Sequence, residues 1–214
     1  HQRTVINTDP MKPLLDVLRE DLEMTGTKQG CDHEGECGAC TVLINGKPIR
    51  SCLTPVGKVH GQRVTTIEGL GKKDQPHPLQ KAFLASGAVQ CGFCIPGMLL
   101  SAKALLDENI NPSREEIKQA LSGNICRCTG YQPIIEAIQI AAKEIQKENQ
   151  PGSMNKIQDP QIIGGNPLRE DSWEKVSGQT QYAEDISIAD LHCLAVLRSP
   201  HHHARLITLD TNKA

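Results

Sequence analysis

Cysteine is the residue type in this sequence whose spacing most clearly implies chemistry. Nine cysteines occur in 214 residues, and eight of them fall into two groups of four. The first group is Cys31, Cys37, Cys40 and Cys52, and the second is Cys91, Cys94, Cys126 and Cys128. Thiolates gathered in fours at such short spacings are typical of metal ligands. We therefore expect two metal centres, with these eight cysteines as the ligands.

The first group has nearly the spacing of a plant-type ferredoxin. Five residues separate Cys31 from Cys37, two separate Cys37 from Cys40, and eleven precede Cys52. Plant-type ferredoxins place one thiolate, a gap of four, a Cys-x2-Cys pair and a distant fourth cysteine around a [2Fe-2S] cluster. Residues 41–49 read as a β-branched strand, an Asn-Gly turn and a second strand, which predicts a hairpin that returns Cys52 to the loop. The spacing therefore indicates a [2Fe-2S] cluster.

Two alternatives to an iron–sulfur cluster exist for this first group. A disulfide framework suits short secreted chains, whereas this sequence is long, has an odd number of cysteines and shows no apolar signal segment at its start. A structural zinc site is the stronger alternative, although zinc ribbons usually supply two knuckles of paired cysteines.

The second group lies among predicted helices. Two residues separate Cys91 from Cys94 and one separates Cys126 from Cys128, so a zinc site or a thioredoxin-like pair would also fit this group taken alone. A thioredoxin pair belongs in a βαβ pattern, but the surrounding sequence predicts helices. From proline positions, a capping box and apolar periodicity we expect four of them, over residues 78–89, 96–109, 113–122 and 133–147. The cysteine pairs then lie at the ends of helices in a small bundle.

Three motifs carry a resemblance to a known family. They are GCDHEGECGACTV at residues 30–42, QCGFCIPGM at 90–98 and GNICRCTGY at 123–131. Together they resemble the two iron–sulfur motifs of the xanthine oxidase or molybdenum hydroxylase family. The family usually has four residues between the first two cysteines, whereas this chain has five, as if Glu34 were inserted. The resemblance implies one [2Fe-2S] cluster per motif domain, with the helical cluster nearer the molybdenum. It also implies that Gln90 and Cys128 contact the pterin.

The same resemblance predicts an α+β fold made of successive domains. We expect a β-grasp ferredoxin-like domain over residues 1–75, a four-helix bundle domain over 76–148 and a linker over 149–165. Residues 166–214 resemble the opening of the molybdenum-binding part, and we interpret them as the beginning of an α/β hammerhead-like domain that is truncated here. Within the first domain we also expect a short strand at residues 3–6 and a core helix at 13–20.

The last predicted domain contains two features that could be mistaken for ligand sites. His201, His202 and His203 lie between two strand-like runs, at residues 193–197 and 205–209, and we interpret them as part of a structural loop. Cys193 alternates with apolar neighbours, which favours a small buried residue over a ligand.

Composition excludes several other classes of function. The formal net charge is −2 and aromatic residues make up 2% of the chain, so nothing suggests nucleic acid as a partner. No apolar run approaches the roughly 20 residues needed to cross a bilayer, and we expect a cytoplasmic protein with no membrane span.

These observations lead to a functional hypothesis. We expect the iron–sulfur electron-transfer part of a molybdenum hydroxylase of the xanthine dehydrogenase or aldehyde oxidoreductase type. The two [2Fe-2S] clusters would pass electrons from a molybdopterin site, bound mainly outside this segment, to a flavin subunit or an external acceptor such as a ferredoxin or flavodoxin. We expect FAD, if present, only in a partner. The other expected partner is the remainder of the molybdenum-binding catalytic subunit. We also expect the protein to form an oligomer. No catalytic residue is assigned within the chain. The alternatives are a stand-alone ferredoxin-like electron carrier and a zinc-stabilised interaction module.

Overall fold

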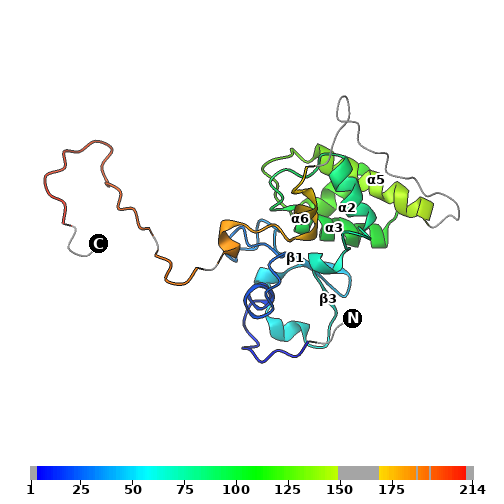
Figure 1. Cartoon of the computed structure of the whole chain (residues 1–214), viewed down its shortest axis with the longest axis horizontal. Coiled ribbons are helices and arrows are strands. Elements are labelled where there is room, and N and C mark those ends of the chain that lie inside the picture. Colours follow the sequence, from blue (N-terminus) through cyan, green and yellow to red (C-terminus); the bar gives the residue numbers. More distant parts are fainter. Residues whose placement is uncertain (1–3, 149–168, 187, 193, 211–214) are drawn as a thin grey trace. The chain divides into compact units, whose positions relative to one another are not determined.

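The computed structural model describes residues 4–148, 169–186, 188–192 and 194–210. The chain divides into two compact units, residues 1–181 and residues 182–214. The first unit combines a three-stranded sheet with helices, so its fold is α+β (Figure 1). Each unit is described by itself below.

The sheet of the first unit is built on the predicted hairpin. Strand β1 (Thr41–Ile44) lies between β2 (Lys47–Arg50) and β3 (Val64–Thr65), and both neighbours run antiparallel to it. The turn residues Asn45 and Gly46 have φ values of 51° and 85°, as a tight hairpin turn requires. Strand β1 is buried throughout while β2 is exposed, so the sheet has a protected central strand beside the predicted cluster loop. The predicted hairpin is confirmed.

A short helical segment covers this sheet. Helix α1 (Leu14–Asp16) continues as the π-helical turn η1 (Val17–Asp21), which confirms the helix predicted at 13–20. Its apolar side packs against the buried residues of β1. The N–H of Leu14 donates to the carbonyl of Thr54 at 2.7 Å, so the start of α1 is tied to the segment that follows Cys52. Three 3-10 turns complete this region: η2 (Ser51–Leu53), η3 (Val56–Val59) and η4 (Ile67–Gly69).

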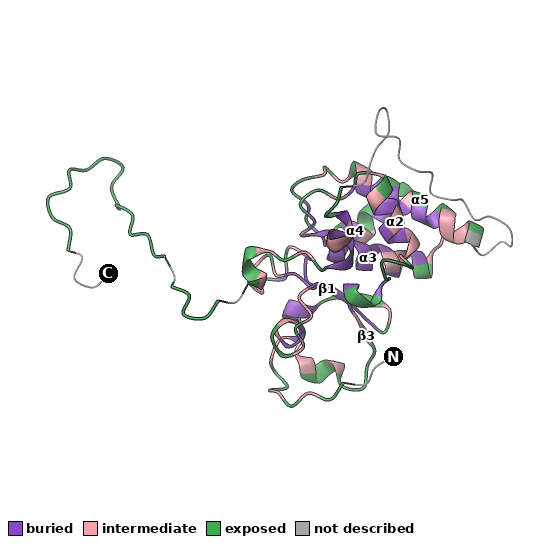
Figure 2. Cartoon of the chain, in the orientation of Figure 1, coloured by how far each residue is buried: buried purple, intermediate pink, exposed green. Residues whose placement is uncertain are grey.

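All four helices predicted for the middle of the chain are confirmed. They are α2 (Pro78–Ala85), α3 (Ile95–Glu108), α4 (Arg114–Leu121) and α5 (Gln132–Glu148). Their buried faces share one apolar core, and Figure 2 shows these faces turned inward. Helix α3 also contacts the sheet, because its Leu100 and Ala104 pack against Leu43 of β1. This helix therefore belongs to the core of both the sheet and the bundle.

A segment distant in sequence completes the first unit. Residues 169–181, which we call the strap, contain helix α6 (Ser172–Ser177). Val176 is fully buried in the core of the bundle, and its carbonyl accepts a 3.0 Å hydrogen bond from Nε2 of Gln80. The carbonyl of Thr180 accepts one of 2.9 Å from Nζ of Lys28, which is 1% exposed. The strap thus contacts residues from both predicted cluster domains, and the whole of the predicted linker, residues 149–165, lies outside the described residues.

The second unit is less regular. It begins with the 3-10 turn η5 (Ala183–Asp185), and the described residues beyond it form neither helix nor strand. The predicted strands were therefore wrong for residues 194–197 and 205–209, and also for 4–6 in the first unit. Alternating apolar residues specify a face, but a strand forms only where a neighbouring strand takes up its N–H and C=O groups. The three histidines lie exposed in a bend, and Cys193 lies outside the described residues.

Candidate metal centres

The first group of cysteines comes together as two thiol pairs. The sulfurs of Cys40 and Cys52 lie 3.3 Å apart, and the thiols of Cys31 and Cys37 are hydrogen-bonded to each other. A disulfide bond is about 2.05 Å long, so these are thiol contacts. Burial, followed by the proximity of Cys40 and then of the other two thiols, raises the pKa of Cys52 to about 12. All four predicted ligands therefore lie close enough together for the charge of one thiolate to affect the others.

The hairpin positions this site. Cys40 immediately precedes β1 and Cys52 follows β2, so the antiparallel pairing of these strands brings the two cysteines together. The hydroxyl of Ser51 donates to the carbonyl of Cys40 at 2.8 Å and closes the end of the ladder. This is the arrangement that the Asn-Gly turn predicted.

Backbone N–H groups surround the sulfur of Cys31. Burial opposes ionisation of this thiol, but hydrogen bonds from the N–H and the thiol of Cys37 and from the N–H groups of Glu36 and Gly35 outweigh it and lower the pKa of Cys31 below its ordinary value. Gly35 has a φ of 75°, a conformation that turns successive N–H groups toward one side. The loop therefore forms a nest for a negatively charged sulfur.

The second group of cysteines also forms two pairs. The sulfurs of Cys91 and Cys128 lie 3.4 Å apart, and Cys94 is hydrogen-bonded to Cys126. Burial, and then the nearby Cys126, raises the pKa of Cys94. Cys126 is buried as well, but hydrogen bonds from the hydroxyl and N–H of Thr129 and from the N–H of Cys128 lower its pKa. Each group thus contains one sulfur that the local backbone stabilises as a thiolate.

The two pairs of the second group differ in exposure. Cys94 and Cys126 are buried at the start of α3 and in the turn before α5, whereas Cys91 and Cys128 are exposed. Gln90, the other residue expected to contact a pterin, is also exposed and directly precedes Cys91. One edge of this centre is therefore open to solvent in the described chain.

A buried polar junction connects the two centres. The N–H of Ile125, next to Cys126, donates to the carbonyl of Cys37 at 2.8 Å. Nδ2 of Asn124 donates to the carbonyl of Gly38 at 2.9 Å, and its Oδ1 accepts from the Ser101 hydroxyl at 2.7 Å. The backbones approach so closely that a Cβ on Gly38 would lie 2.0 Å from the carbonyl oxygen of Gly123. The two cysteine groups are thus parts of one continuous structure.

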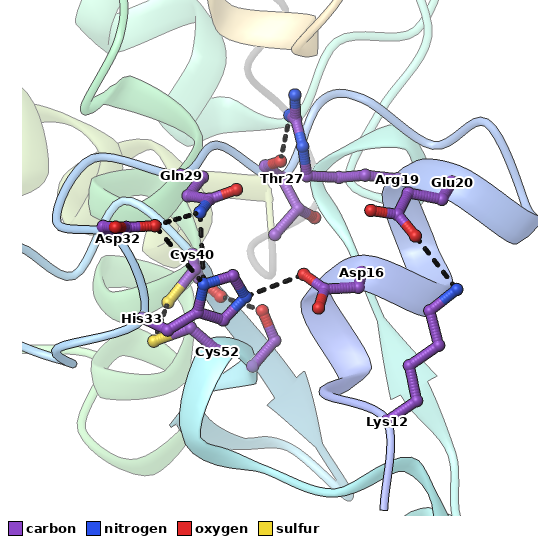
Figure 3. Close-up of polar contacts among 11 residues, drawn as sticks. Lys12, Asp16, Arg19, Glu20, Thr27, Gln29, Asp32, His33, Cys40 and Cys52 are labelled. Carbon is purple, nitrogen blue, oxygen red and sulfur yellow. Dashed lines mark hydrogen bonds and ion pairs between the residues drawn. The ribbon is translucent and has the colours of Figure 1, made fainter. Parts of the chain in front are cut away.

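Sequence reasoning missed the roles of Tyr131, His33 and Asp16, which hold the cysteine loops. Tyr131 has a φ of 69°, and its hydroxyl accepts from the N–H of Cys126 at 2.9 Å and donates to the carbonyl of Asn124 at 3.2 Å. His33 lies in the first loop and contacts Asp16 of α1 (Figure 3). Two sequence features could have drawn attention to these residues. Tyrosine is rare in this chain, and the loop between Cys31 and Cys37 is one residue longer than is usual in the family.

The donor sets fit two [2Fe-2S] clusters. Such a cluster takes four cysteine thiolates, and N–H groups directed at sulfur stabilise its negative charge. Both centres offer four thiols in two pairs, as two irons with two thiolates each require, and both direct backbone N–H groups at sulfur. When bound, such clusters carry one electron at a time.

Comparisons with known proteins define the class of the chain. The family model described as "2Fe-2S iron-sulfur cluster binding domain" matches residues 1–64, and the one described as "[2Fe-2S] binding domain" matches residues 66–139. The chain thus carries two [2Fe-2S]-binding domains.

Individual relatives narrow this class to a family. The chain is 41% identical over 210 residues to the aldehyde oxidoreductase of Megalodesulfovibrio gigas, covering 94% of this chain and 23% of the relative. It is 52% identical over 138 residues to the nicotinate dehydrogenase small FeS subunit of Eubacterium barkeri, covering 64% of this chain and 87% of that subunit. The solved aldehyde oxidoreductase of Desulfovibrio gigas superposes with a TM-score of 0.77 at 41% identity, over 85% of this chain and 20% of that one. The chain belongs to the molybdenum hydroxylase family and comprises its iron–sulfur part.

Proposed function

We propose that this chain transfers electrons, one at a time, between a molybdopterin site and an electron acceptor through two [2Fe-2S] clusters. The observation that carries the proposal is the pair of four-cysteine centres joined by the hydrogen bond from Ile125 to Cys37. The ligands proposed are the eight cysteines of the two groups. A structural zinc site stabilises the fold locally, so a zinc-stabilised module would not require two thiol centres to be directly connected.

The junction supplies a short route between the centres. From the sulfur of Cys37 the route follows the side chain and backbone to the Cys37 carbonyl, crosses 2.8 Å to the N–H of Ile125 and continues along one peptide to Cys126. Asn124 and Ser101, which are buried and hydrogen-bonded beside this route, hold the two loops in this geometry. The close glycine contacts keep the backbones at this separation.

The exposed edge of the second centre is the proposed entry point for electrons. Gln90 is exposed beside Cys91, whose sulfur meets that of Cys128 at 3.4 Å. These residues can therefore meet a cofactor held by another part of the protein. We propose that Gln90 and Cys128 contact the pterin there, as the family resemblance implies.

We propose that the whole protein extends beyond the electron-transfer part. We propose the domain order of a β-grasp domain, a four-helix domain and the beginning of a hammerhead-like domain. The match to aldehyde oxidoreductase continues over 210 residues, which favours a catalytic part on the same polypeptide. The remaining partners proposed are a FAD-containing subunit, or a ferredoxin or flavodoxin, and a further copy of the protein.

Two observations bear on where the protein works. No helix in the described part of the chain is both long and apolar enough to cross a bilayer. The eight cysteines form no disulfide among the described residues, which supports our proposal of a reducing compartment, the cytoplasm.

Metal analysis tests this function. We expect about four irons and four acid-labile sulfides per chain in the purified protein, since two [2Fe-2S] clusters hold that many. Partial reduction should give two separable electron paramagnetic resonance (EPR) signals, because the two loops offer different hydrogen bonds and exposure. A Cys52→Ser variant should lose one signal and keep the other. Zinc in place of iron, with no signal on reduction, would refute the proposal.

A further inference from the structure

The loop between the first two cysteines has an unfavourable backbone. Asp32 and His33 have φ values of 46° and 65°, in the left-handed region that residues with a Cβ seldom occupy. Gly35 follows at 75°, where glycine has no penalty. Two successive left-handed residues other than glycine persist only where other contacts hold them.

The side chain of His33 supplies such a contact. Its Nε2 lies 2.8 Å from Oδ1 of Asp16, and its Nδ1 lies 3.2 Å from Nε2 of Gln29 (Figure 3). The Gln29 amide nitrogen donates to Nδ1, so Nε2 carries the hydrogen and donates it to the Asp16 carboxylate. Figure 3 shows the imidazole lying between the loop and α1. The loop thus brings the ring of His33 into contact with a helix.

Asp16 is a fixed point for this contact. It is the last residue of α1, and both of its neighbours in sequence, Leu15 and Val17, are fully buried. The start of the same helix is tied to Thr54 by the hydrogen bond from Leu14. A loop bound to Asp16 is therefore bound to the core of the domain.

The loop in turn holds the N–H groups that surround Cys31. Those groups belong to Gly35, Glu36 and Cys37, which follow Asp32 and His33 after the single residue Glu34. A second contact within the loop is the 2.9 Å hydrogen bond from the N–H of Glu34 to the carbonyl of Cys31. A change in the backbone conformation of His33 would therefore also move the N–H groups that donate hydrogen bonds to the sulfur of Cys31.

We propose that His33 is a positioning residue for the first cluster: its hydrogen bond to Asp16 holds the loop so that three N–H groups point at Cys31. The proposal rests on the proposed function, because it takes Cys31 as a cluster ligand. Hydrogen bonds to sulfur favour the more negative, reduced state of a cluster. The His33–Asp16 contact therefore raises the reduction potential of the first cluster and leaves that of the second unchanged.

Redox titration followed by EPR tests the proposal on the full-length protein with its clusters. In His33→Ala we expect the first cluster to be harder to reduce. At a fixed applied potential, its ratio of reduced to oxidised form should fall at least about threefold, which corresponds to roughly 30 mV for a one-electron couple. The line shape of its signal should change, while the signal and potential of the second cluster should stay those of the parent.

Three further variants separate the contact from general effects. Asp16→Asn keeps an acceptor oxygen for Nε2 and should retain the parent line shape of the first signal. Lys12→Met breaks another ion pair that involves the same helical segment, in which Nζ of Lys12 lies 2.9 Å from Asp21, and should change neither cluster. If His33→Ala does not fold, Asp16→Leu removes the same contact without altering the loop sequence and should give the result expected of His33→Ala.

The outcomes distinguish the two proposals. Selective loss of the first cluster's iron in His33→Ala would support the positioning role in its strongest form. An unchanged first signal and potential in a folded His33→Ala protein with full iron content would overturn this inference while leaving the proposed function intact. Absence of iron from the parent protein would instead refute the proposed function.

Discussion

At the scale of single residues, Tyr131 is the side chain most directly responsible for the shape of the second centre. A tyrosine at a φ of 69° is unfavourable, and its ring is held there by two hydrogen bonds through one hydroxyl. One of these takes up the N–H of Cys126, and the other fixes the carbonyl of Asn124. The hydroxyl therefore closes the turn that presents Cys126 and Cys128.

Tyr131→Phe removes this hydroxyl and keeps the ring. The N–H of Cys126 and the carbonyl of Asn124 lose a partner, so we expect the free energy of unfolding to fall by about 1–3 kcal/mol. The released N–H lies beside the thiols, and the EPR signal of the second cluster should shift while that of the first does not. Denaturant unfolding and EPR check the two effects. Tyr182→Phe, in the other unit, is the control; identical spectra for Tyr131→Phe and the parent would contradict this role.

At the scale of elements, α3 does two tasks at once. Cys94 directly precedes its first residue, and its middle packs on both the bundle core and β1. Close packing against the first loop requires glycine in the helix, because a Cβ on Gly97 would lie 2.5 Å from the carbonyl oxygen of Gly38. Ser101, one turn further, reaches Asn124 across the junction. Helix α3 thus fixes the separation of the two cysteine groups.

Asn124→Ala tests the contribution of this junction to stability. The change removes hydrogen bonds to Gly38 and Ser101 and leaves the Ser101 hydroxyl buried without its acceptor. We expect a loss of about 2–3 kcal/mol in the free energy of unfolding, measured by denaturant titration of the cluster-loaded protein. Asn111→Ala, at an exposed position, should change it by less than about 0.5 kcal/mol. Equal effects of the two substitutions would show that the junction polar groups contribute little.

At the scale of the whole molecule, the strap joins the two cluster domains of the first unit. Its Gly178 has a φ of 79° and lies against Gly26, and a Cβ there would be 2.5 Å from Ile67 and 2.7 Å from the Gly26 backbone. Lys175, in α6, is 6% exposed and pairs with Asp171 at 2.6 Å. A protease can reach the bond after Lys175 only if the strap leaves its place.

Gly178→Ala should therefore release the strap. We expect trypsin to cut after Lys175 several-fold faster than in the parent, relative to the cut after the exposed Arg169, as followed by mass spectrometry. Gly87→Ala is a matched control, because Gly87 has a similar φ of 69° but open space around its Cβ position. That variant should bear the backbone strain, about 1 kcal/mol, and keep Lys175 protected. Rapid cutting after Lys175 in both variants would mean that strain alone opens the strap.

The sequence by itself determined the features that depend on local pattern. The four bundle helices followed from apolar spacing, proline positions and the Ser113 capping box, and the hairpin followed from its Asn-Gly turn, because these signals act over a few residues. The division of the cysteines into two groups followed from their spacing, and the structure brings each predicted group together as two pairs. The bounds of the domains, the ligand roles and the pterin contacts stay predictions.

Only the tertiary structure decided what depends on neighbours remote in sequence. The strand patterns at 194–197 and 205–209 form no strands in the described chain, because a strand needs a partner for its backbone groups. The strap's place beside Gln80 and Lys28, the Cys37–Ile125 hydrogen bond and the His33–Asp16 contact join residues between 17 and 152 positions apart. No local rule encodes such contacts, since they arise where packed elements happen to bring polar groups within hydrogen-bonding distance and bury them together.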